Sequence, residues 1–232
     1  QRRILYMNTC DQAQIWTTSH CQNQPEPRLT IQRMRFTAGN STGDLTEGGG
    51  GGAVFVRGGQ VKVIESVFTS NRCDATGPDL GGGAVRVLSQ FEALPVIVAT
   101  STFDSNRCSN GAALSSIGVS WAIYNSVFTR NPAIGEGANP QRPGTPGGGS
   151  GGAIYLDGNL FDLDLVGSVI RDNSAREGGG AIFFVSNDRS GHLRITRSTL
   201  ERNPSAGFET RGFPGIFFLG SGSPQVVDST IR

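Results

Sequence analysis

The chain has few lysines, few histidines and no long hydrophobic segment. Lys62 is its single lysine, its histidines are His20 and His192, and acidic and basic residues are interspersed to a net charge of +1. Such a balance argues against a nucleic-acid partner, which requires concentrated positive charge. No apolar run approaches the roughly 18 residues of a membrane-spanning helix, so we expect no membrane insertion of this segment.

Metal-binding motifs are also missing. The four cysteines include no Cys-x-x-Cys pair, and two histidines are too few to complete an ordinary zinc site with them. No Gly-Lys-[Ser/Thr] follows the glycine run at 48–52, which argues against a phosphate-binding loop. We therefore expect no metal and no other cofactor.

Glycine, by contrast, is abundant, with 34 residues, about twice the average usage. No strict Gly-X-Y period is present, so a collagen helix is excluded. Instead, a Gly-Gly-Ala-apolar motif recurs at 51–54, 82–85, 151–154 and 179–182, with weaker versions at 111–114 and 214–217. These recurrences point to a repeat architecture with dense turns.

A second motif follows the first at a nearly fixed distance. Each of the first five motifs in chain order is followed 20 to 24 residues later by an asparagine, and a serine precedes that asparagine by five residues. The asparagines lie 25 to 42 residues apart. A constant unit with insertions of variable length is typical of a solenoid. The residues of this predicted structural ladder are Asn71, Asn106, Asn131, Asn173, Asn203, Ser66, Ser101, Ser126, Ser168 and Ser198.

The local pattern within each repeat indicates strands. Apolar residues alternate with other residues, as at Val61 and Val63 or at Leu193 and Ile195. The glycines and β-branched residues argue against helical repeats. Strands of successive coils would then stack in parallel about 4.8 Å apart. We predict an all-β, single-domain, right-handed parallel β-helix, with the handedness that parallel crossovers usually adopt.

In such a stack, equivalent residues lie above one another. Phe68, Phe103 and Phe128, continued by aliphatic residues in later coils, are expected to fill a narrow core. We expect the asparagines at a corner for two reasons. Asparagine tolerates the left-handed backbone conformation, and its amide can hydrogen-bond to the next asparagine of the column.

The repeat resembles that of a known family. Gly-Gly-Ala-apolar combined with Phe-x-x-Asn, which is literal at 68–71, 103–106 and 128–131, is similar to the repeat of the polymorphic outer-membrane proteins. These are autotransported surface adhesins with β-helical passengers. The resemblance covers residues 29–232 and implies a β-helical fold and a secreted or cell-surface, outer-membrane-associated location.

Residues 1–28 do not match the repeat. We interpret them as an N-terminal cap or part of an earlier coil, followed by the β-helix at 29–232. The longest insertion has no strand pattern, and we expect a flexible spacer there. All insertions follow the asparagine column and should project from one edge; they are 41–50, 74–81, 132–150, 174–178 and 204–212.

Two cysteines occupy the same place in consecutive repeats. Cys73 and Cys108 each stand two residues after a ladder asparagine. Stacked positions would bring their Cα atoms about 4.8 Å apart, within the range of a disulfide. We predict this bridge, with two free stacked thiols as the alternative. Cys10 and Cys21 would then pair near the N-terminus.

The best candidate for an acid/base site lies in one coil and comprises Asp157, Asp162, Asp164, Arg171 and Asp172. Its spacing places Asp164 above Arg194 and Asp162 near His192 on the next coil. Charges of opposite sign on adjacent rungs are ordinary cross-strand pairs. We therefore assign no catalytic residue.

We expect a non-enzymatic extracellular or cell-surface β-helix, adhesin- or passenger-like, that displays loops along one edge. Its expected partner is a glycan or protein on a host or neighbouring-cell surface. The alternative is a polysaccharide lyase or glycoside hydrolase, since such enzymes need clustered carboxylates with Arg, Lys or His. A third reading is a structural component of a surface assembly.

Overall fold

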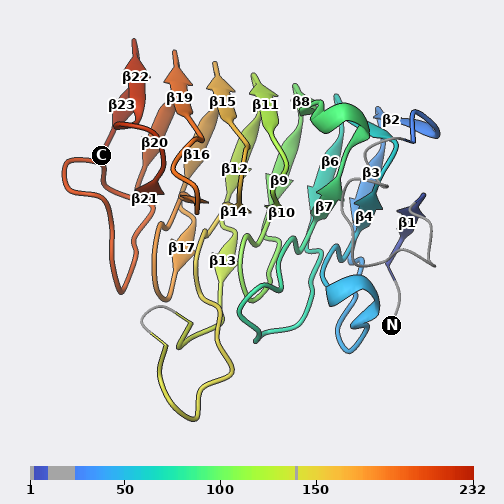
Figure 1. The fold of residues 1–232 in the computed structure, drawn as a ribbon, viewed down its shortest axis with the longest axis horizontal. Coiled ribbons are helices and arrows are strands. Elements are labelled where there is room, and N and C mark those ends of the chain that lie inside the picture. Colours follow the sequence, from blue (N-terminus) through green and yellow to red (C-terminus); the bar gives the residue numbers. More distant parts are fainter. Residues whose placement is uncertain (1–2, 10–23, 139–140) are drawn as a thin grey trace.

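The computed structural model describes residues 3–9, 24–138 and 141–232. Their regular structure is almost entirely β, with helical content limited to the 3-10 turns η2 (Thr46–Gly48) and η3 (Phe91–Ala93). In chain order the strands belong in turn to three seven-stranded sheets, apart from two short strands that form a sheet of their own, and all strand pairs within the three sheets are parallel. The chain therefore passes once through each sheet in every coil (Figure 1). This arrangement is all-β, as predicted, and is consistent with a β-helix.

The bounds of the strands define the three sheets. The first sheet contains β1 (Leu5–Asn8), β4 (Val54–Arg57), β7 (Val85–Ser89), β10 (Leu114–Ile117), β14 (Ile154–Gly158), β18 (Ile182–Ser186) and β21 (Ile216–Leu219). The second sheet contains β2 (Arg28–Gln32), β5 (Gln60–Ile64), β8 (Val96–Ala99), β11 (Trp121–Tyr124), β15 (Leu163–Val166), β19 (Leu193–Thr196) and β22 (Gln225–Val227). The third sheet contains β3 (Arg35–Thr37), β6 (Val67–Thr69), β9 (Thr102–Asp104), β12 (Val127–Thr129), β16 (Val169–Arg171), β20 (Thr199–Glu201) and β23 (Thr230–Ile231).

The core lies between the sheets and consists of equivalent side chains of successive coils stacked on one another. The rings of Phe36, Phe68, Phe103 and Phe128 are parallel, with centroids 4.8 to 4.9 Å apart. Ile170 continues the same position on the next coil. Offset or parallel packing of aromatic rings adds to the free energy gained from burial alone. The stack begins one coil earlier than the repeated motif indicates, at Phe36.

The five ladder asparagines form a buried, hydrogen-bonded column. Asn106 illustrates its pattern: its backbone N–H and its Nδ2 both donate to Oδ1 of Asn131, at 2.9 and 3.0 Å. Nδ2 also donates to the carbonyl oxygen of Phe68, and Oδ1 accepts from Asn71 in turn. Each amide thus satisfies backbone groups that the corner would otherwise leave unpaired.

We expected the left-handed backbone conformation at these asparagines, but it occurs one residue earlier. The positive φ angles fall on the residue before each one: 55° at Ser70 and Ser105, 54° at Arg130, 58° at Asp172 and 53° at Arg202. The preceding residue makes the bend, which frees the asparagine to turn its amide inward along the column. Hydrogen bonding, not backbone tolerance, therefore explains why asparagine occupies this position.

The serines form a similar column at the other end of the third sheet. The N–H of Ser66 donates to Oγ of Ser101, and the N–H of Ser101 donates to Oγ of Ser126, each at 3.1 Å. Ser168 and Ser198 continue the series. Each bend of the third sheet is therefore bridged from coil to coil by a side chain.

Glycine opens each coil because of its backbone conformation. Gly82 has a φ of 73°, and a Cβ atom there would collide with the carbonyl oxygen of Val85. The following alanines, such as Ala84, are fully buried. A larger side chain has no room at either position, which explains why glycine and alanine recur at these positions of the motif.

The last copy of the motif is displaced by one residue from our alignment. We placed it at 214–217, but Ile216 pairs with Ile182, so Gly215 takes the alanine position. A shift of one residue exchanges the two faces of a strand. Phe217 consequently lies outside the core, against Phe183, with ring centroids 5.2 Å apart.

We expect the asparagine column to contribute more to stability than the exposed charge pairs. Replacing Asn106 by Ala should lower the free energy of unfolding by about 1–3 kcal/mol, because neighbouring buried groups lose their partners. Replacing the partly exposed Asp164 by Asn should lower it by less than about 1 kcal/mol. Chemical denaturation of both variants measures the difference, and a larger loss for Asp164→Asn would contradict this ranking.

Candidate binding edge formed by the insertions

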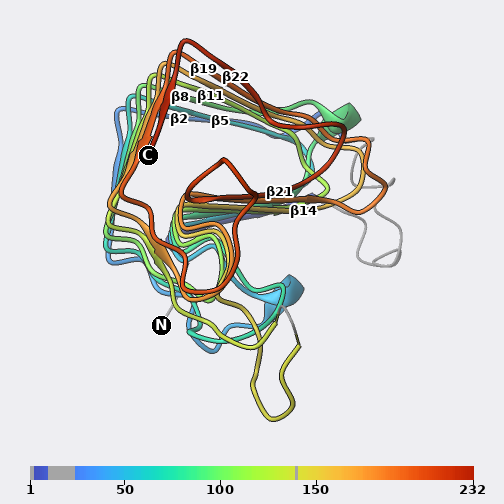
Figure 2. The same ribbon diagram turned by 90° about the vertical axis from the view of Figure 1, so that its left-hand side faces the viewer.

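The insertions leave their coils after the asparagine column and lie along one edge of the solenoid (Figure 1). We call this the insertion edge. In Figure 2 it occupies the lower part of the view, beneath the first sheet. Phe208, from the last insertion, contacts Phe183 edge-on with ring centroids 6.4 Å apart. Leu80, from the second insertion, is 8% exposed. The insertions therefore form a packed layer.

Neighbouring insertions are hydrogen-bonded to one another. The N–H of Gly77 donates to the carbonyl oxygen of Gly147 at 3.0 Å. Asn110 bridges two of these segments: its Nδ2 donates to the carbonyl oxygen of Pro78 at 2.6 Å, and its Oδ1 accepts from the N–H of Ser150 at 3.0 Å. Such bonds give the edge a continuous backbone surface.

The longest insertion, 132–150, differs from the spacer that we expected. Its first residues form β13 (Pro132–Ala133), which pairs in parallel with β17 (Ser174–Ala175). This pairing uses backbone groups alone, so it leaves no alternation of apolar side chains in the sequence. A strand of two residues beside proline and glycine cannot be recognised from periodicity.

A buried carboxylate holds the middle of the same insertion. The side chain of Glu177 is 3% exposed and forms an ion pair with Arg142 at 2.7 Å. It also accepts a hydrogen bond from the N–H of Gly137. Hydrogen bonds that involve a charged group are stronger than neutral ones. Sequence reasoning missed Glu177, because nothing in its local pattern distinguishes it from a loop residue.

The outer face of the first sheet carries a column of buried side chains that the insertions cover. In chain order its central members are Phe55, Arg86, Ser115, Tyr155 and Phe183. Arg86 is 3% exposed, and its Nη1 donates to Oγ of Ser115 at 3.3 Å, while its Nε has no hydrogen-bond partner. Burial lowers the pKa of Arg86 to about 10. Sequence reasoning did not identify this residue either.

A small pocket opens between this face and the insertions. Its volume is about 250 Å³, and its lining includes Asp79, Tyr155, Asp157 and Asn187. The hydroxyl of Tyr155 donates to Asp157 at 3.1 Å, and burial raises the pKa of Tyr155 well above its usual value. The hydroxyl therefore stays protonated near neutral pH. A larger pocket of about 670 Å³ lies further along, lined by Arg142, Glu177 and Phe208 among others.

The predicted carboxylate cluster is distributed over three sheets. Asp157 lies on the first sheet, Asp162 and Asp164 lie at the second, and Arg171 and Asp172 lie at the third. Residues close in sequence separate because the chain turns between sheets within one coil. The five residues therefore do not come together as one site, and the pairing of Asp164 with Arg194 that their spacing predicted is confirmed.

The part of that cluster on the second sheet forms a charge network with the next coil. Arg194 pairs with Asp164 at 2.5 Å and with Asp162 at 2.9 Å, and His192 contacts Asp162 at 3.2 Å. Burial alone would raise the pKa of Asp162, but hydrogen bonds from Arg194 and His192 lower it below its usual value. A carboxyl group held ionised by its partners is poorly suited to act as a general acid.

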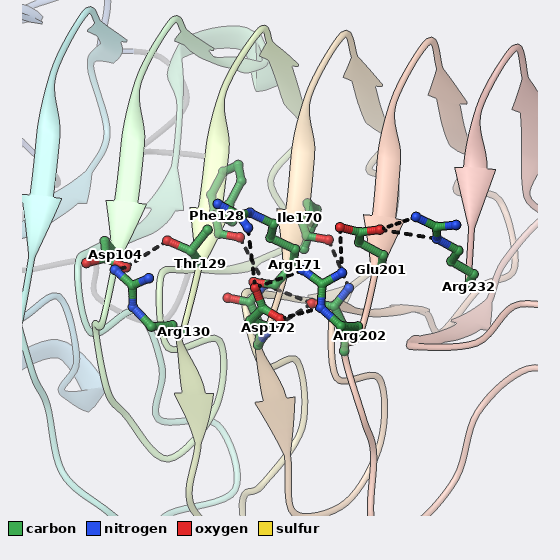
Figure 3. Close-up of polar contacts among 12 residues, drawn as sticks. Asp104, Phe128, Thr129, Arg130, Ile170, Arg171, Asp172, Glu201, Arg202 and Arg232 are labelled. Atoms are coloured by element: carbon green, nitrogen blue, oxygen red, sulfur yellow. Dashed lines mark hydrogen bonds and ion pairs between the residues drawn. The ribbon is translucent and has the colours of Figure 1, made fainter.

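The outer surface of the third sheet shows the same alternation of charge (Figure 3). Arg202 pairs with Asp172 at 2.7 Å on the preceding coil. Hydrogen bonding to Arg202 lowers the pKa of Asp172. Related pairs link Arg232 to Glu201 and Arg130 to Asp104. These exposed ion pairs connect side chains on neighbouring coils, and each contributes little to stability.

The predicted disulfide between Cys73 and Cys108 is present, with Cα atoms 4.8 Å apart. It joins consecutive coils at the start of the insertion edge, next to the buried Leu80. Cys10 and Cys21, for which we predicted a second bridge, lie outside the described residues.

Neither a metal centre nor a membrane span is found in the parts of the chain that the structure describes. No group of three or more His, Cys, Asp or Glu side chains there could hold a metal ion. The helices of the same ranges are single turns, and none could cross a membrane.

Comparisons with protein-family models, curated proteins and solved structures found no match. The resemblance to the polymorphic outer-membrane proteins thus depends on the repeat motifs alone.

Removing the disulfide should weaken the solenoid. Replacing both Cys73 and Cys108 by Ala opens a loop of 35 residues and should lower the free energy of unfolding by about 3–4 kcal/mol in the loop-entropy model. Denaturation of oxidised wild type and of the double variant measures this loss. Equal stability, or free thiols at both positions in a non-reduced digest, would contradict the prediction.

Glu177 should control the order of the longest insertion without controlling the fold. Glu177→Gln should speed amide hydrogen exchange of residues 135–149 about tenfold, because a charged hydrogen bond of about 1.5–3 kcal/mol is weakened. The unfolding midpoint should change little. Arg142→Gln, which leaves the bond to Gly137 intact, serves as the control with a smaller effect. Unchanged exchange in Glu177→Gln would show that backbone contacts alone hold the insertion.

Proposed function

We propose that this chain is a right-handed parallel β-helix and acts as a non-enzymatic binding module of an extracellular or cell-surface protein. The insertion edge is its binding surface, and the partner is a glycan or protein on another surface. One observation carries the proposal: insertions of unequal length converge on one edge and are hydrogen-bonded into a continuous, pocketed layer. Binding residues are commonly found on loops that a rigid scaffold positions.

Two further features support this proposal. The disulfide is typical of proteins in oxidising compartments, which favours a secreted or surface location. The repeat motifs resemble those of adhesin passengers, which use the same kind of scaffold. The polar and aromatic lining of the pocket near Tyr155 suits a ligand rich in hydroxyl groups.

An enzyme acting on a polysaccharide is the second candidate. The network of Asp162, Asp164, His192 and Arg194 places carboxylates, an imidazole and a guanidinium together on the second sheet. The mutual pairing of these groups argues against catalysis, because a general acid needs a raised pKa, whereas the hydrogen bonds from Arg194 and His192 lower the pKa of Asp162.

A panel of neutral and acidic glycans, assayed for both binding and product, tests the two candidates. We expect binding without turnover, and binding should persist in Asp162→Asn/His192→Asn, which alters the opposite side of the coil. Turnover that this double variant abolishes would favour the enzyme. Absence of binding to every glycan of the panel would favour a protein partner or a structural role in an assembly.

A further inference from the structure

Two arginines occupy the same position on consecutive coils of the insertion edge. Arg72 and Arg107 are joined by a parallel backbone bridge, and each directly follows a ladder asparagine. Both side chains are exposed. Within the described ranges, neither guanidinium has a hydrogen bond or an ion pair within 4.0 Å. This pair therefore differs from the opposite charges that stack elsewhere on the solenoid.

Like charges directly opposite each other on adjacent strands are destabilising. Stacked positions at Asp164 and Arg194, by contrast, carry opposite charges and form an ion pair. The stability of the fold thus gives no reason for arginine at both Arg72 and Arg107. An anion between the two guanidinium groups would remove their repulsion.

The disulfide fixes the spacing of the two arginines. Each arginine is followed by one of its cysteines, Cys73 or Cys108, whose Cα atoms are 4.8 Å apart. The covalent link keeps the two coils from separating under the repulsion. A backbone that is held in place before a ligand arrives loses little entropy on binding, which favours affinity.

A pocket of about 410 Å³ lies between the arginines and the neighbouring insertions, with Thr42 and Ile134 also in its lining. The nearest acidic residue in sequence, Asp74, accepts a hydrogen bond from the N–H of Gly43 at 2.9 Å and forms no ion pair with either arginine. The donors at the mouth of this pocket are therefore available to an external acceptor.

A third exposed arginine lies on the same edge, two coils beyond Arg107 and three residues after its own ladder asparagine. The N–H of Arg176 donates to the carbonyl oxygen of Ala133, the residue before Ile134 in the pocket lining. Its guanidinium also lacks an ion pair with the described residues. Charges spaced over several coils suit an extended ligand with repeated anionic groups better than a single small ion.

We propose that Arg72 and Arg107 bind a sulfate or carboxylate group of an acidic glycan. Guanidinium groups match such oxyanions with paired N–H donors, and these charge-assisted bonds are strong. The inference rests on the proposed function of the edge and names its ligand class. A near-neutral chain with acidic residues such as Asp79 and Glu136 on the same edge is less suited to a uniform polyanion like DNA.

The test compares Arg72→Gln/Arg107→Gln with the control Arg35→Gln/Arg197→Gln, which removes the same charge from exposed positions away from the pocket. Binding of a heparin oligosaccharide, a polygalacturonate of equal length, a neutral glucan, inorganic sulfate and a DNA duplex is measured by calorimetry at two salt concentrations. We expect the first variant to lose about tenfold or more in affinity for the acidic glycans. The control should change by less than about twofold, with both variants folded by circular dichroism.

The two acidic glycans separate sulfate from carboxylate recognition, and either preference supports the proposal. Equal losses in both variants, or unchanged affinity in Arg72→Gln/Arg107→Gln, would overturn it while leaving the binding function of the edge intact. Binding of the neutral glucan alone would do the same. Equally strong, arginine-dependent binding of DNA would overturn the assignment to glycans. Wild-type protein that binds no glycan in either panel would refute both the inference and the glycan-binding form of the proposed function.

Discussion

The column of buried asparagine amides is the interaction on which the rest of the architecture depends. From Asn106 onward, each Oδ1 accepts from the backbone N–H and the Nδ2 of the asparagine on the preceding coil, while Oδ1 of Asn71 accepts from the N–H of Gly39. Because both bonds meet at one atom, the coils cannot slide without losing them together. An unsatisfied buried amide is costly, so the column fixes which residues lie above one another. The aromatic stack, the disulfide and the charge pairs all follow from that register.

A fixed corner also explains where the chain tolerates extra length. The entropy cost of closing a loop rises slowly with its length, so insertions of very different sizes can leave from the same point. Here they return across the outer face of the first sheet and pack on Phe183 and Arg86. Two of the buried charges in this layer differ. Glu177 is paired with Arg142, whereas Arg86 has one hydrogen bond and a lowered pKa.

The charged side chains on the solenoid fall into two groups: those paired with an opposite charge on the next coil, and those that are not. On the second and third sheets, the partners alternate in sign from coil to coil, as at Asp172 and Arg202 (Figure 3). Exposed pairs of this kind add little stability but avoid repulsion between rungs. Arg72 and Arg107 break the alternation next to a covalent link. A departure from a pattern that the rest of the molecule follows is the kind of feature that binding explains better than folding does.

The sequence by itself determined the repeat, the parallel β architecture and the Cys73–Cys108 bridge. These could be predicted because stacking makes spacing along the chain equivalent to position in space, so a repeated Phe-x-x-Asn marks a repeated contact. The same logic placed Asp164 beside Arg194. It required only the period of the pattern and the distance between strands.

The tertiary structure alone decided how the insertions pack and which residues they bury. Insertions have no period, so no spacing could place Glu177 against Gly137 or bring Phe208 onto Phe183. The same reason accounts for the errors: the left-handed residue before each asparagine and the displaced motif at 214–217 both depend on where the chain bends. Bends are set by backbone geometry and by contacts between coils, which a pattern of side chains along one coil does not record.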